Sequence, residues 1–72
     1  MQNSNNLRFI RVGDYTFAAD YILSVERVNK KLVIVKYVSG ESCCMIFDSS
    51  EKCEDFYEEI SYKLVVVNRF GI

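Results

Sequence analysis

The chain has 72 residues, of which 50% are hydrophobic and 14% aromatic, and its net charge at pH 7 is −1. A chain of this length forms one small domain with a marginal core, and a near-zero net charge excludes a global positive field that would attract nucleic acid. The sequence contains no histidine, which removes the commonest general base and the commonest metal ligand.

The first two-thirds of the chain predicts short β-strands joined by tight turns. Gly13-Asp14, Asn29-Lys30 and Ser39-Gly40-Glu41 separate runs that are rich in β-branched and aromatic residues. Connections this short join antiparallel neighbours, so we expect an antiparallel sheet of four to five strands. The predicted strands cover residues 7–12, 15–17, 21–28, 31–39 and 42–47.

The strand predicted over residues 31–39 is apolar on both of its faces. By alternation, Leu32 and Ile34 point to one side of the sheet, while Val33 and Val35 point to the other. A pattern of this kind is typical of a central strand that is covered on both sides. Since one helix covers only one face of a sheet, we expect the other face to meet another subunit, a ligand or a partner.

After residue 47 the hydrophobic period changes from that of a strand to that of a helix. Asp48 followed by Glu51 resembles a capping box, so we expect a helix that begins near Ser49 and ends at Tyr62 or Lys63. Acidic residues fill its outer side. The apolar stripe consists of Cys53, Phe56, Tyr57, Ile60 and Leu64.

These elements predict an α+β fold in which an antiparallel sheet precedes one amphipathic C-terminal helix. We expect a flexible N-terminus over residues 1–6 and a single domain over residues 7–64. Residues 65–72 begin with a β-branched run, which predicts either a closing edge strand or an apolar C-terminal tail that assembles with another chain.

No catalytic, cofactor or metal site is predicted. The three cysteines include the adjacent pair Cys43 and Cys44, whose side chains point to opposite faces of a strand and do not match the C-x₂₋₄-C spacing of zinc sites. The glycines are isolated, and no serine lies in a nucleophile-elbow motif. We therefore expect a protein that binds something and has no enzymatic activity.

The odd number of cysteines is typical of reduced thiols in a reducing compartment, and no apolar run reaches the roughly 20 residues that span a bilayer. We expect a soluble, cytoplasmic protein without a membrane partner. Small domains of this kind usually need an additional source of stability, and self-association supplies one.

The first hypothesis is therefore a homo-oligomer that acts as a regulator or inhibitor of a larger protein partner. A surplus of apolar residues in so short a chain predicts exposed patches, and such patches mark interfaces. The candidate oligomer contacts are Val33, Val35, Val65, Val67 and Phe70.

The alternative hypothesis is a binder of a nucleotide ligand or of single-stranded nucleic acid. Basic residues in the strand half alternate with aromatic ones, and cations for phosphate together with rings for stacking are what such ligands require. The candidate contacts are Arg8, Phe9, Arg11, Tyr15, Tyr21, Arg27, Lys36 and Tyr37.

In element order alone, residues 7–64 resemble the transcriptional-coactivator family of single-strand binders. The resemblance implies a fold in which four strands precede a helix that forms the dimer contact. It includes no shared motif, so it assigns no residue a role.

Overall fold

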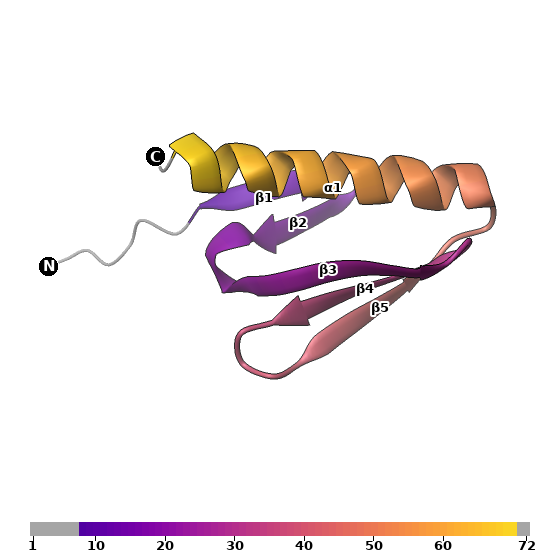
Figure 1. Ribbon diagram of the computed structural model, residues 1–72, viewed down its shortest axis with the longest axis horizontal. Helices are drawn as coiled ribbons and strands as arrows, with labels where there is room; N and C mark the ends of the chain where they lie inside the picture. Colours follow the sequence, from indigo (N-terminus) through magenta and orange to yellow (C-terminus); the bar gives the residue numbers. More distant parts are fainter. Residues whose placement is uncertain (1–7, 71–72) are drawn as a thin grey trace, which may run out of the picture.

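The structure of the protein, a computed structural model, describes residues 8–70 (Figure 1). Antiparallel strands precede one long C-terminal helix, so the predicted α+β fold is confirmed. The predicted flexible segment 1–6 and the last residues, 71–72, lie outside the described residues. The elements are β1 (Phe9–Val12), β2 (Tyr15–Ala18), the 3₁₀ helix η1 (Ala19–Tyr21), β3 (Ile22–Asn29), β4 (Leu32–Tyr37), β5 (Ser42–Ile46) and α1 (Ser50–Phe70).

The five strands divide between two sheets, whereas the sequence predicts one. β1 and β2 form a hairpin, and β3, β4 and β5 form a second sheet in that order. The division falls at η1, where the Ala19 amide donates to the Arg8 carbonyl at 2.7 Å and so closes the first sheet. Two residues later the Tyr21 carbonyl accepts from the Val38 amide at 2.9 Å, which opens the second.

The turns lie close to the predicted positions. Gly13 and Gly40 have φ of 61° and 99°, a region that glycine enters without a steric penalty. The middle turn is displaced by one residue, because Asn29 still pairs with Leu32 and its side-chain oxygen accepts from the Lys31 amide at 2.9 Å. Lys30 and Lys31 therefore form the turn between β3 and β4.

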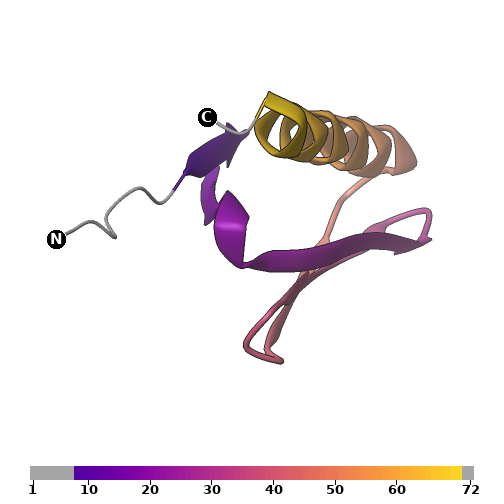
Figure 2. The same ribbon diagram turned by 60° about the vertical axis from the view of Figure 1, so that its left-hand side comes forward.

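The helix α1 lies across one side of both sheets, as two views of the ribbon show (Figures 1 and 2). Its inner stripe includes Cys53 and Ile60, both fully buried, and the ring of Phe56, which packs 5.1 Å from Phe47 between centroids. This stripe joins the two sheets into one core. The buried residues are Ile10, Val12, Phe17, Ala19, Val33, Val35, Met45, Cys53, Phe56 and Ile60.

Ser49, rather than Asp48, caps the start of α1. The Ser49 hydroxyl accepts from the Lys52 amide at 3.2 Å, and the Ser49 carbonyl accepts from the Cys53 amide at 3.1 Å. The exposed carboxylate of Asp48 instead lies before the helix, 3.9 Å from the ammonium group of Lys52. The predicted capping box is therefore replaced by a simple serine cap.

The prediction of a tail or edge strand is wrong for residues 65–70, because α1 continues to Phe70. Leu64 and Val67 extend the inner stripe and pack against the core. The Arg8 guanidinium also donates to the Val67 carbonyl at 3.2 Å. Packing of this stripe outweighs the weak helix propensity of three consecutive valines.

The outer side of α1 is acidic, as predicted, and includes Glu51, Glu54, Asp55, Glu58 and Glu59, all exposed. Within residues 8–70, no helix combines the length and the apolar composition that crossing a membrane requires.

Candidate functional site

One face of the β3–β5 sheet points away from α1, and the described residues leave it uncovered. Alternation along β4 and β5 defines it, since Val33 and Val35 are 0% exposed and Met45 is 6% exposed on the side that α1 covers. On the opposite side, Ile46 is 81% exposed. We call this side the outer face, and it consists of Ser24, Glu26, Leu32, Ile34, Lys36, Ser42, Cys44 and Ile46.

The strand register arranges the outer face in rows across the three strands. Leu32 lies opposite Ile46, and Ile34 lies opposite Cys44, so two neighbouring rows are apolar on β4 and β5. Glu26 lies opposite Ile34, and its carboxylate is 3.3 Å from the ammonium group of Lys36. The outer face is thus apolar near β5 and carries an ion pair towards β3.

The structure corrects the predicted oligomer contacts. Val33 and Val35 point into the chain's own core and are not available to another subunit. Val67 is half-buried against the same core, whereas Val65 is 54% exposed on α1. Alternation alone could not tell which side of β4 the helix covers, so Ile34 was missed. The side chain of Phe70 lies outside the described ones.

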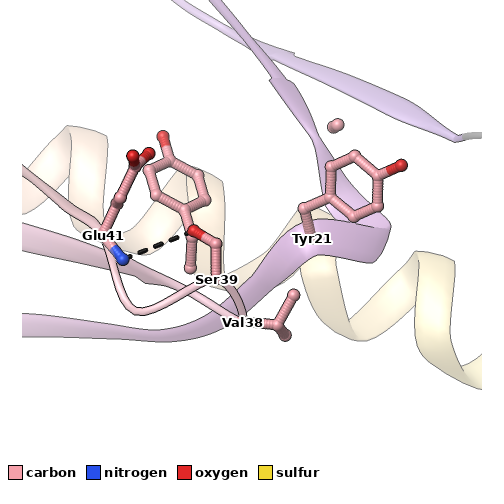
Figure 3. A pocket seen from close by; sticks show the side chains of 6 residues that line it. Tyr21, Val38, Ser39 and Glu41 are labelled. Atoms are coloured by element: carbon pink, nitrogen blue, oxygen red, sulfur yellow. Dashed lines mark hydrogen bonds between the residues drawn. The ribbon is translucent and has the colours of Figure 1, made fainter.

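A shallow apolar pocket lies between η1 and the β4–β5 turn. Its volume is about 360 Å³, and Tyr21 lies on one side of it, with Ser39 and Glu41 on the other (Figure 3). Burial, with smaller contributions from Cys43 and Glu41, raises the pKa of Tyr37 in its wall above the ordinary value of 10.0. The lining residues are Ala18, Tyr21, Tyr37, Val38, Ser39 and Glu41.

This pocket brings together Tyr21 and Tyr37, two of the predicted ligand contacts, but none of the basic ones. Its charged lining residue is Glu41, a carboxylate that disfavours a phosphate group. The pocket is therefore better suited to a neutral or cationic group than to a nucleotide.

Arg8 serves the fold. Its backbone amide donates to the Asp20 carboxylate at 2.9 Å, its Nε donates to the same carboxylate at 3.1 Å, and its Nη2 forms an ion pair with it. With the further bond to Val67, these contacts hold the start of β1, η1 and the end of α1 together.

Replacement of Asp20 by Asn is expected to give a pH-dependent loss of stability. Hydrogen bonds from Arg8 hold the pKa of Asp20 below its ordinary value of 3.8, so the folded state favours the ionised carboxyl. This contribution is present above pH 3.8 and is lost as the pH falls through the folded-state value. Urea unfolding should therefore show wild type more stable than Asp20→Asn near neutral pH, with the difference shrinking in acid. Asp14→Asn is the matched control, and an equal loss there would contradict the assignment.

Arg27 is likewise engaged within the chain. Its guanidinium donates to the Lys30 carbonyl at 3.2 Å and to both the carbonyl and the hydroxyl of Ser50 at 3.3 Å. Its buried Nε has no partner among the described residues. These bonds connect the end of β3 to the first turn of α1, so this arginine too supports the fold.

The other predicted ligand contacts are scattered over the surface. Phe9 and Tyr15 are 62% and 51% exposed, and the ring of Tyr15 lies edge-on to Phe56 at 6.2 Å. Arg11 is exposed beside the first turn, and Lys36 lies on the outer face. The predicted basic and aromatic residues do not gather on one surface.

The three cysteines occupy different environments, and none is in a disulfide. Cys53 is buried in α1, Cys43 is half-buried on the inner side of β5, and Cys44 is exposed on the outer face. The structure thereby distinguishes the two adjacent thiols. Among residues 8–70, no three Cys, Asp or Glu side chains gather as metal ligands do.

Comparisons with protein-family models, with curated proteins and with solved structures found no match.

Proposed function

We propose that this protein is a small, non-enzymatic interaction protein that works as a homo-oligomer and acts on a larger protein partner. The observation that carries the proposal is the outer face, where Ile46 is 81% exposed beside Leu32 and Ile34. Contiguous apolar surface of this kind is typical of protein interfaces. A domain this small also gains stability when such a surface is buried against a second chain.

The free cysteines support a reducing compartment, and we retain the cytoplasm as the expected setting. The alternative, a nucleotide or a single-stranded nucleic acid, has less support. Arg8 and Arg27 use their guanidinium groups within the chain, and Lys36 pairs with Glu26. A phosphate-binding surface needs such cations to be available.

We expect light scattering after size exclusion to give a mass that is a multiple of the 8.4 kDa chain. Ile46→Lys should raise the dissociation constant about tenfold, because burying an isoleucine contributes about 1.5 kcal/mol or more. Tyr62→Lys is the matched control, since Tyr62 is 69% exposed on α1, away from the outer face. A wild-type chain that stays monomeric at millimolar concentration would overturn the proposal, and salt-sensitive binding of a short oligonucleotide would favour the alternative.

A further inference from the structure

Among residues 8–70 no strand pairs with the second edge of β5, and the hydrogen-bonding groups of this edge can be assigned. The Tyr37 amide donates to the Glu41 carbonyl at 2.9 Å, and the Phe47 amide donates to the Lys31 carbonyl at 2.9 Å. In an antiparallel ladder, alternate residues bond to the same neighbour, so Cys43 and Met45 also bond to β4. The amides and carbonyls of Ser42, Cys44 and Ile46 therefore point away from the sheet.

The other strand edges are protected in ways that β5 is not. Lys63 donates from α1 to the Arg11 carbonyl on the outer edge of β1. β2 has only four residues, and β3 is interrupted by register shifts near both of its ends. Short strands, irregular pairing and covering lysines all discourage edge-to-edge association. β5 pairs with β4 without a register shift, and its five residues, Ser42–Ile46, include no charge and no proline.

We propose that β5 pairs antiparallel with β5 of a second copy about a two-fold axis at Cys44, which joins the two three-stranded sheets. This inference rests on the proposed self-association and places its contact at the β5 edge of the outer face, where Ile46 packs beside Ser42 of the second copy. It leaves the rest of the outer face to the larger protein partner. With the axis at Cys44, the full length of both strands overlaps, and Ser42 lies opposite the Ile46 of the second copy. All the outward amides and carbonyls of Ser42, Cys44 and Ile46 are then paired, which gives about six hydrogen bonds.

The side chains are compatible with this pairing on both faces of the joined sheet. On the outer face, Ile34 and Cys44 of one copy continue into Cys44 and Ile34 of the other, as one apolar row. On the inner face, Cys43 lies opposite Met45 of the second copy. Beyond the strand ends, Glu41 faces Phe47 and Gly40 faces Asp48, so no carboxylate opposes another.

The thiol of Cys44 provides the test. Its exposed side chain would lie directly opposite its symmetry mate, in a hydrogen-bonded pair whose Cα atoms are about 5.5 Å apart, within the range that a disulfide bridges. We expect oxidation with copper phenanthroline to convert the wild-type protein to a covalent dimer on non-reducing gels. Cys43→Ser should retain this product, and Cys44→Ser should abolish it.

Two further measurements distinguish the antiparallel pairing of β5 with β5 from self-association through another surface. Cys44→Lys places two like charges opposite each other and should raise the dissociation constant by about tenfold or more, with an unchanged circular dichroism spectrum. Hydrogen exchange of the Cys44 amide should slow as protein concentration rises, whereas the Cys43 amide is protected throughout by β4. A wild-type dimer by mass that neither cross-links through Cys44 nor responds to Cys44→Lys would overturn the edge pairing and leave the proposed function standing. A wild-type monomer would overturn both.

Discussion

Val35→Lys is expected to unfold the protein, whereas Ile34→Lys, one residue away on the same strand, is expected to leave it folded. Val35 is 0% exposed under α1, so the lysine ammonium would be buried without a partner. That burial costs about 4 kcal/mol or more, a large part of the roughly 4–11 kcal/mol that stabilises a domain of this size. Ile34 lies on the outer face opposite Glu26, where a lysine remains hydrated and meets a carboxylate.

Circular dichroism and urea unfolding of the two variants would check this difference. The pair is matched in strand, in substituted charge and in the length of the new side chain, so it isolates the face of the sheet. Equal loss of folding in both variants would contradict the placement of α1 on the Val35 side. A folded Val35→Lys beside an unfolded Ile34→Lys would place the helix on the other side of the sheet.

Ile60→Ala is expected to lower the free energy of unfolding by about 3–4 kcal/mol. Ile60 is 0% exposed in the stripe of α1 that joins the two sheets, so truncation removes buried methyl groups and leaves a cavity. Val65→Ala, on the exposed side of the same helix, is the matched control. Val65 is 54% exposed, and alanine is the better helix former, so its effect should stay within about 0.5 kcal/mol.

Urea denaturation with linear extrapolation measures both differences, and an unchanged m-value would show that the same unfolding transition is compared. A loss at Val65 as large as that at Ile60 would contradict the packing described for α1. The Val65 variant also tests the end of the helix, because an edge strand would be weakened by alanine where a helix is not.

The strand half of the fold could be predicted because its signals are local. Gly13 and Gly40 lie in the hairpin turns, and the alternation of apolar and polar residues identifies the strands between them. The helix start was predicted within one residue from the change of period, although Ser49 supplies the cap. The end of the helix was not predicted, because three consecutive valines favour a strand by themselves. Packing of Leu64 and Val67 on the core keeps this segment helical.

The candidate site shows the same division. The alternation of residues along β4 indicates that both faces of this strand are apolar. It therefore predicts that one face of the sheet is left uncovered by the helix. The choice of Val33 and Val35 as the contact surface was wrong, because alternation is symmetric and does not identify the covered side. The sequence also could not show that Arg8 and Arg27 bond within the chain, because the groups that accept from them, such as the carbonyls of Val67 and Ser50, are distant in sequence.

The sequence by itself determined the order of the five strands and the helix, the start of that helix and the excess of apolar residues, since each depends on neighbours within a few residues. Only the tertiary structure decided that η1 separates two sheets, that α1 covers the Val35 side, and that β5 is an edge strand of its sheet with Cys44 at its centre. These features depend on which distant segments meet. The free energy that stabilises this arrangement comes from contacts between α1 and strands that are distant in sequence. No pattern within a few residues predicts those contacts.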